Sequence, residues 1–181
     1  MNKSLIETMR LETERLIIRR FNQTDKEGLF ELMSDPETCS DDGGYKPIEK
    51  NDEKFDVIVQ RFSADTNRFA VVLKETGETI GTIHLMDVDR GVDALELGYV
   101  INKNHRRRGY AYECSSAILD FCFDKVCVEM MVASAFTFNI KSQNLLTKLG
   151  FIQEGITHKA MKHLVFGTAD LVNYYKLKNE N

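Results

Sequence analysis

The sequence predicts an α+β (mixed α/β) fold, in which one mixed β-sheet is flanked by about four helices. Strand-like segments at 69–73, 79–86 and 94–101 follow one another with short polar connections, which is typical of an antiparallel meander. Segment 110–124 then has the one-sided apolar spacing of a helix and leads into an apolar, β-branched stretch at 126–135. A strand, a helix and a second strand in this order predict a parallel pair, so the sheet should be mixed.

Three elements are expected before the meander. The apolar run 16–18, between two arginines, predicts a strand, and 24–27 has the pattern of a capping box that begins a helix. Asp35 and Pro36 should end that helix. Residues 39–47 are polar and rich in glycine, so we expect a loop that flanks the substrate entrance. Apolar residues at helical spacing between 55 and 62 predict a second helix.

The C-terminal part predicts one further helix and two strands. Asn139 is a plausible N-cap for a helix that runs to Leu149, and Gly150 would end it. Strands are expected near 151–156 and 169–177.

Composition limits the function classes. The chain has 181 residues, a hydrophobic fraction of 43% and two prolines, which predict one folded domain over residues 1–181. A net charge of −4 opposes a broad nucleic-acid footprint. Nucleic acid is therefore not expected as a partner. No apolar leader and no window of membrane-spanning length is visible, so a membrane is not expected as a partner either. The four cysteines lack CxxC spacing, which favours a reducing, cytoplasmic location.

The most informative motif is the run Arg106-Arg107-Arg108-Gly109-Tyr110-Ala111, which lies between a predicted strand and a predicted helix. Glycine lets the backbone approach an anion closely, free N–H groups at a helix N-terminus point toward it, and arginines add charge-assisted hydrogen bonds. The run therefore indicates a phosphate site. A solvated loop end is the alternative interpretation of such a short basic run.

Several separated segments together resemble the Gcn5-related N-acetyltransferase (GNAT) superfamily and its RimJ/RimL-like branch. The arginine-glycine run is similar to the acetyl-CoA motif of that superfamily. Residues 13–19 resemble the opening strand of the branch, 96–101 its central strand and 139–151 its late helix. The resemblance spans nearly the whole chain.

This resemblance implies a twisted sheet with a central splay, between the strand ending at Ile101 and the strand starting near Val126, and acetyl-CoA in the opening. Pantetheine amides would pair with the open strand, and the pyrophosphate would lie on the N–H groups of the loop. The implied cofactor-binding residues are Tyr99, Val100, Ile101, Arg106, Arg107, Arg108, Gly109, Tyr110, Ala111 and Asn139.

Acetyl transfer to an amine requires a base, an oxyanion donor and a proton for the departing thiolate. Glu96, on the face of its strand opposite the apolar residues, is the candidate base, although a solvated or salt-bridged glutamate explains it equally well. A backbone N–H near Val100 would stabilise the oxyanion, unless it forms an ordinary ladder hydrogen bond. Ser142 is the candidate acid, or else a first-turn serine bonded to the helix backbone. Many relatives outside this branch have a tyrosine where this chain has Leu146.

The resemblance thus implies an acetyl-CoA-dependent N-acetyltransferase that acts on a primary amine by direct attack in a ternary complex, as a monomer or homodimer. The acceptor would be a protein N-terminal α-amine, of ribosomal-protein type, or a small-molecule amine. Residues 159–162 offer no carboxylate where some ribosomal-protein relatives use a glutamate, which weighs against a ribosomal substrate.

Other functions stay open as alternatives. They are a polyamine- or aminoglycoside-type acetyltransferase, a non-catalytic CoA-binding sensor and, opposed by the acidic pI, an RNA-binding module. The acidic pair Asp41 and Asp42 would attract a cationic amine. The four histidines show no metal-ligand spacing, so no metal is expected.

Overall fold

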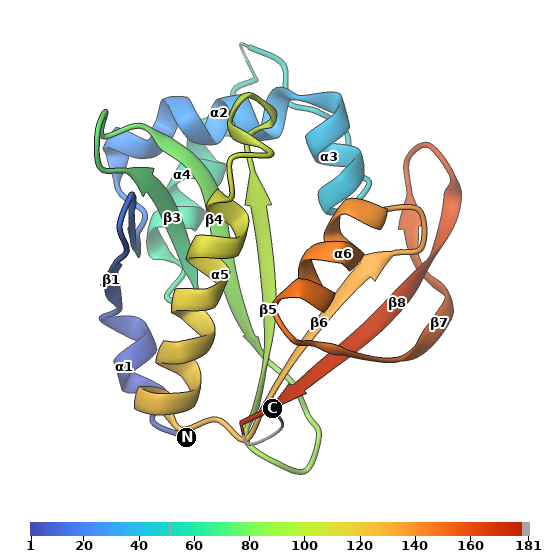
Figure 1. The fold of residues 1–181 in the computed structure, drawn as a ribbon. Helices are drawn as coiled ribbons and strands as arrows, with labels where there is room; N and C mark the ends of the chain where they lie inside the picture. Colours follow the sequence, from blue (N-terminus) through green and yellow to red (C-terminus); the bar gives the residue numbers. More distant parts are fainter. Residues whose placement is uncertain (51, 179–181) are drawn as a thin grey trace.

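The computed structural model describes residues 1–50 and 52–178, and this part of the chain holds eight strands in one mixed sheet (Figure 1). The strand order is β1-β2-β3-β4-β5-β6-β8-β7. The strands are β1 Arg10–Glu12, β2 Leu16–Arg20, β3 Arg68–Leu73, β4 Thr79–Asp87, β5 Ala94–Ile101, β6 Met130–Phe136, β7 Ile152–His163 and β8 Gly167–Leu177. The predicted α+β class, meander and mixed sheet are confirmed.

The sheet is antiparallel except where β5 meets β6. That parallel pair is short, because it joins only Ala94, Leu95 and Glu96 of β5 to β6. Beyond Glu96 the two strands diverge, as the V between β5 and β6 in Figure 1 shows. The central splay implied by the family resemblance is therefore present.

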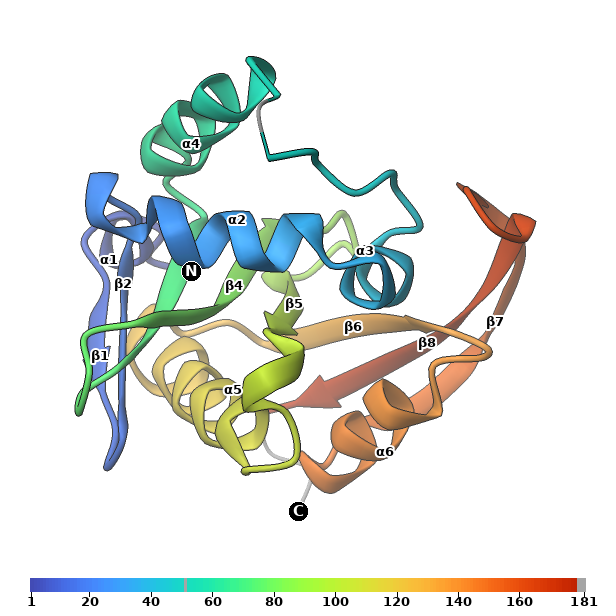
Figure 2. The same cartoon turned by 90° about the horizontal axis from the view of Figure 1, so that it is seen from above.

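Helices cover both faces of the sheet (Figure 2). In that view α2, α3 and α4 lie on one side, and α5 and α6 lie on the other. The α-helices are α1 Ser4–Glu7, α2 Lys26–Ser34, α3 Pro36–Asp42, α4 Lys54–Ala64, α5 Tyr110–Phe121 and α6 Ile140–Lys148. Short 3-10 helices, η1 Gln23–Asp25 and η2 Lys103–His105, and a π-helix, η3 Cys122–Val126, complete the set. No helix of the described residues is long and apolar enough to cross a membrane.

Two predictions about the two ends of α2 are wrong. The capping box is formed by Asn22 and Asp25, not by 24–27: the Asn22 side chain accepts from the Thr24 N–H, and Asp25 accepts from the Asn22 N–H. The predicted loop at 39–47 begins only after α3, because Asp35 caps a second helix with Pro36 in its first turn. Proline thus ends α2 and begins α3.

Two strand boundaries also differ from the prediction. The stretch 126–135 is mostly apolar, but Val126 and Val128 reach the core from the π-helix and the turn that follows it, so β6 begins only at Met130. β7 extends past the predicted 151–156 to His163, because a bulge near Lys159 (φ 50°) interrupts the pattern without ending the pairing.

Candidate functional site

The candidate site lies where β5 and β6 part (Figure 1). The strands are last paired at Glu96 and Val132, and β5 then continues to Ile101. Along residues 97–101, β4 covers one edge of β5 and β6 no longer covers the other. An open strand edge presents N–H and C=O groups with which an extended ligand can pair through amides of its own.

The residues that face the open edge follow from strand geometry, because alternate residues turn their N–H and C=O groups to the same edge. The Asn102 N–H donates to a β4 carbonyl at 2.8 Å, and a Cβ added to Gly81 of β4 would collide with the Val100 carbonyl. Val100 therefore faces β4, and Tyr99 and Ile101 face the opening. An oxyanion donor near Val100 therefore has to be the N–H of Tyr99 or Ile101, since the N–H of Val100 itself lies on the β4 side.

The arginine run forms a left-handed loop in front of α5. Arg107 (φ 62°) and Gly109 (φ 85°) both have positive φ, which glycine adopts without strain. Gly109 is the N-cap and offers no side chain to the first-turn N–H groups, so these point out of the helix. The side chains of Arg107 and Arg108 are exposed and form no ion pair with another described residue. Free N–H groups, a helix dipole and two free guanidinium groups fit a pyrophosphate.

Arg15, just before β2, holds this loop in place. Its guanidinium lies over the Tyr110 ring at 4.5 Å, and it donates to the Arg108 carbonyl at 3.0 Å and to Glu113 at 2.7 Å. Burial alone would raise the pKa of Glu113, but hydrogen bonds from Thr13 and Arg15 lower it. The ion pair thus fixes the first turn of α5, and no sequence motif indicates this contact.

The Arg106 side chain is committed to α3. Its Nε donates to the Ile101 carbonyl at 3.0 Å and its Nη2 to the Thr38 hydroxyl at 2.9 Å. Its Nη1 lies 3.0 Å from Glu37 and 3.5 Å from Asp41. These contacts tie the end of β5 to α3 across the top of the opening.

Glu96 lies at the fork itself. Its neighbours Leu95 and Leu97 are buried in the main core with α5, so Glu96 lies on the opposite face of the sheet, as predicted. Its Oε1 accepts a hydrogen bond from the Ser134 hydroxyl of β6 at 3.0 Å. No ion pair joins Glu96 to another residue in the described part of the chain, so this carboxylate keeps its second oxygen for other partners.

Ser142, in the first turn of α6, contacts a tyrosine hydroxyl. Asn139 caps the helix by accepting from the Ser142 N–H at 3.1 Å and donates to the Asp41 carbonyl at 3.3 Å. The Ser142 Oγ lies 2.8 Å from the Tyr99 hydroxyl, and burial raises the pKa of Tyr99 to about 12. Leu146 is fully buried. Tyr99, predicted only as a backbone contact, thus brings a protonated hydroxyl to the predicted acid.

The acidic pair at the end of α3 already has partners within the protein. The Asp42 carboxylate accepts from the Tyr45 hydroxyl at 2.8 Å, and Asp41 lies 3.5 Å from Arg106. Burial raises the pKa of the half-buried Asp41 carboxyl group. Asp41 and Asp42 are therefore poorly suited to attract and bind a cationic amine.

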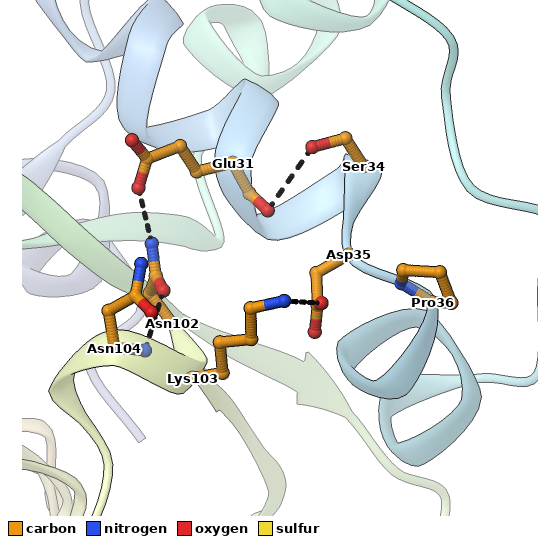
Figure 3. Close-up of a pocket in the computed structure, with 7 residues that line it drawn as sticks. All are labelled: Glu31, Ser34, Asp35, Pro36, Asn102, Lys103 and Asn104. Carbon is orange, nitrogen blue, oxygen red and sulfur yellow. Dashed lines mark hydrogen bonds and ion pairs between the residues drawn. The ribbon is translucent and has the colours of Figure 1, made fainter.

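A shallow pocket lies beside the site, between the ends of α2 and β5 (Figure 3). Its polar groups are paired with one another: the Asn102 amide donates to Glu31 at 2.6 Å, and the Lys103 ammonium pairs with Asp35. These pairs hold the segment between β5 and the arginine loop against α2 and α3. The residues that line this pocket therefore hold the arginine loop in position.

Comparison with known proteins places this geometry in a family. Residues 15–152 match the Acetyltransferase (GNAT) domain family. An N-acetyltransferase of Bacillus subtilis (strain 168), YoaA, is 31% identical over 158 residues, which are 83% of this chain and 87% of that protein. The crystal structure of a GNAT-family acetyltransferase from Bacillus anthracis is 25% identical, with a TM-score of 0.84 over 95% of this chain and 100% of that chain.

A further solved structure shares the fold. The ribosomal-protein-S5-alanine acetyltransferase from Vibrio fischeri is 18% identical, with a TM-score of 0.73 over 95% of this chain and 98% of that chain. The family match spans the open edge of β5, the arginine loop and α6. The chain therefore belongs to the GNAT acetyltransferase family and is an acetyltransferase.

Proposed function

We propose that this enzyme transfers the acetyl group of acetyl-CoA to a primary amine by direct attack in a ternary complex. One observation carries the proposal: the open edge of β5 is followed, after η2, by a loop with free N–H groups and two arginines that form no ion pair with another described residue. This arrangement fits a ligand with an extended amide chain at one end and a pyrophosphate at the other.

Binding of the donor is divided among the predicted cofactor residues. The backbone of Tyr99 and Ile101 would pair with pantetheine, and the N–H groups of 107–111 would hold the pyrophosphate, with the Arg107 and Arg108 side chains adding charge. The side chains of Arg106 and Asn139 already have partners in α3, so we assign them to holding the loop and α6 in position.

The chain offers a group for each step of the transfer. As the amine nitrogen bonds to the acetyl carbon, Glu96 takes the amine proton, directly or through a water. An N–H on the open edge of β5, from Tyr99 or Ile101, would stabilise the oxyanion. As the carbon–sulfur bond breaks, Ser142 gives its proton to the thiolate while the Tyr99 hydroxyl donates a hydrogen bond to the Ser142 oxygen, which then regains a proton from solvent.

We further propose a peptide or protein N-terminal α-amine as the acceptor. Its pKa of about 8 leaves a substantial neutral fraction near neutral pH, whereas a lysine-like amine, with a pKa of about 10.4, needs a stronger base. The fold relative from Vibrio fischeri acts on an alanine of ribosomal protein S5, which supports this choice. A polyamine is less suited, because Asp41 and Asp42 already have partners.

Calorimetry with acetyl-CoA tests the donor site. Gly109→Trp should weaken binding at least tenfold, because φ 85° strains any other residue by about 1–2 kcal/mol and the indole would crowd the N–H groups. Gly77→Trp is the matched control, since Gly77 has φ 75° and open space around it but lies in the β3–β4 turn. Wild-type protein that binds no acetyl-CoA would rule the proposal out.

A further inference from the structure

The imidazole of His84, on β4, has no hydrogen-bond partner among the described residues. His84 lies on β4, and its Nδ1 is buried without a hydrogen bond to any described residue. The rest of the ring also makes no hydrogen bond in the described part of the chain, although the side chain is only partly buried. Buried polar atoms are nearly always bonded, so an orphaned one calls for an explanation by function.

The ring lies beside the candidate site. His84 pairs in register with Gly98 of β5, and a Cβ added to Gly98 would overlap the His84 Nε2 and Cε1. The imidazole therefore extends from β4 over the β5 backbone, and glycine at 98 provides the space it occupies. Glu96 is two residues earlier on the same face, at the fork, so both side chains lie on the face that carries α2, α3 and α4.

The surroundings of His84 keep its ring neutral. Burial, followed by the neighbouring Arg68 guanidinium, lowers the pKa of His84 to about 4, against a smaller opposing effect of Asp65. Arg68 is itself held 3.5 Å from Asp65 and 4.5 Å above the Phe62 ring. At the pH of an ordinary assay the imidazole is thus a neutral group with one donor and one acceptor nitrogen.

We propose that His84 is an acceptor-binding residue, whose Nε2 accepts a hydrogen bond from the N–H of the primary amine and so directs the nitrogen lone pair toward the acetyl carbonyl. This inference rests on the proposed function and names a further residue of that site. His84 gains no proton in the reaction, since the amine proton goes to Glu96.

Substitutions at His84 separate hydrogen bonding from shape. His84→Phe keeps a ring and removes both nitrogens, and should raise the KM for the amine about 5- to 100-fold, with the KM for acetyl-CoA unchanged. His84→Gln places an amide near the position of Nε2 and should restore most of the loss. Met86→Leu, on the same strand and face, is the control and should behave as wild type. Glu96→Gln should instead lower kcat.

Substitutions at Gly98 test the position of the His84 ring over β5 while the imidazole is still present. Gly98→Ala should displace the ring and raise the amine KM as His84→Phe does. In a His84→Ala background the same Gly98→Ala change should add little, because the displaced group is already gone. Additive effects of the two changes would contradict the proposed contact.

The assay uses an alanine-initiated hexapeptide, N-α-acetyl-lysine amide and spermidine as acceptors, with thermal unfolding and acetyl-CoA calorimetry on every variant. If His84→Phe folds, binds acetyl-CoA and keeps the wild-type amine KM, the His84 assignment fails while the proposed function stands. If the wild type acetylates none of these amines, the proposed function fails and this inference with it. Should His84→Phe not fold, His84→Gln and the Gly98 pair decide the matter.

Discussion

The hydrogen bond between Tyr99 and Ser142 joins two segments that are 43 positions apart in the chain. Tyr99 lies on the face of β5 that packs toward α5 and α6, and Ser142 stands at the N-terminus of α6. Because burial raises the pKa of Tyr99 to about 12, its hydroxyl stays protonated over the working range of most enzymes. The pair can therefore pass a proton outward to the leaving sulfur.

Substitution of the two hydroxyls should affect kcat unequally. Ser142→Ala removes the direct donor and should lower kcat about 100-fold, within the usual range for a general acid. Tyr99→Phe leaves Ser142 in place and should cost about tenfold or less. The pH–rate profile of the wild type should show no ionisation of Tyr99 below about pH 10. Equal kcat values for Ser142→Ala and wild type would remove Ser142 from the mechanism.

Resemblance to the family indicated Glu96, Ser142 and the arginine loop, because these residues stand in recognisable local motifs. It did not indicate His84, nor the contact of Arg15 with the arginine loop and α5. Their contacts, with Gly98 and Glu113 respectively, join residues distant in sequence and depend on strand register and helix position. Sequence also left open which N–H near Val100 faces the opening, because the edge that a backbone N–H faces follows from strand pairing and not from residue type.

At the scale of elements, α3 is the part of the site that sequence patterns missed. The helix is short, begins at Pro36 and contains polar residues that are typical of a loop. Several contacts from elsewhere hold it, among them the bond of Arg106 to Thr38, the bond of Asn139 to the Asp41 carbonyl and the ion pair of Lys103 with Asp35. The helix thus joins β5, the arginine loop and α6 across the opening.

Neighbouring arginines should therefore give opposite results. Arg106→Ala removes hydrogen bonds to the Ile101 carbonyl and the Thr38 hydroxyl, and should lower the free energy of unfolding by about 1.5–3 kcal/mol. Arg107→Ala, exposed and without an ion pair in the described residues, should leave stability within about 0.5 kcal/mol and weaken acetyl-CoA binding instead. Urea denaturation and calorimetry on both variants make the comparison. The reverse pattern would contradict the division of roles.

Across the whole molecule, a buried carboxylate, Asp25, joins the start of α2 to the sheet. Asp25 accepts from Arg19 of β2 at 2.8 and 2.9 Å and from the Thr79 hydroxyl of β4. Burial favours the protonated form of Asp25, but hydrogen bonds from Arg19, Thr79 and the Asn22 N–H outweigh it and hold its pKa below the usual value. The carboxylate therefore stabilises the fold while it is ionised.

Acid should remove this contribution. Because the pKa is lower in the folded state, the stabilisation is complete above the unfolded value of about 3.9 and is lost as the pH falls through the folded value. Asp25→Asn should be about 1.5–3 kcal/mol less stable at pH 7 and should show a shallower loss of stability between pH 5 and pH 2. Urea midpoints across that range test it. Parallel curves for variant and wild type would assign acid sensitivity to other groups.

The antiparallel meander, the parallel pair and the order of elements from β2 onward, apart from α3, were predictable from hydrophobic periodicity and connection length. The short elements α1 and β1 were not predicted. The separation of β5 from β6 was predicted only from the family resemblance, since no residue between 94 and 101 indicates where the strand pairing ends. The identity of the acceptor depends on loops and side chains around the opening, including the segment after α3, whose conformation is set by tertiary contacts such as the Leu164 N–H to the Gly44 carbonyl at 2.8 Å.

The most direct test of acetyl transfer is the release of CoA thiol from acetyl-CoA over a panel of amines, with mass spectrometry of the products. The panel contains alanine- and serine-initiated hexapeptides, the same peptides blocked at the N-terminus with one internal lysine, spermidine and an aminoglycoside. We predict thiol release that depends on a free α-amine, with one acetyl group on the peptide N-terminus. Acetyl-CoA binding without thiol release for any amine would contradict the account and identify a CoA-binding protein that does not catalyse transfer.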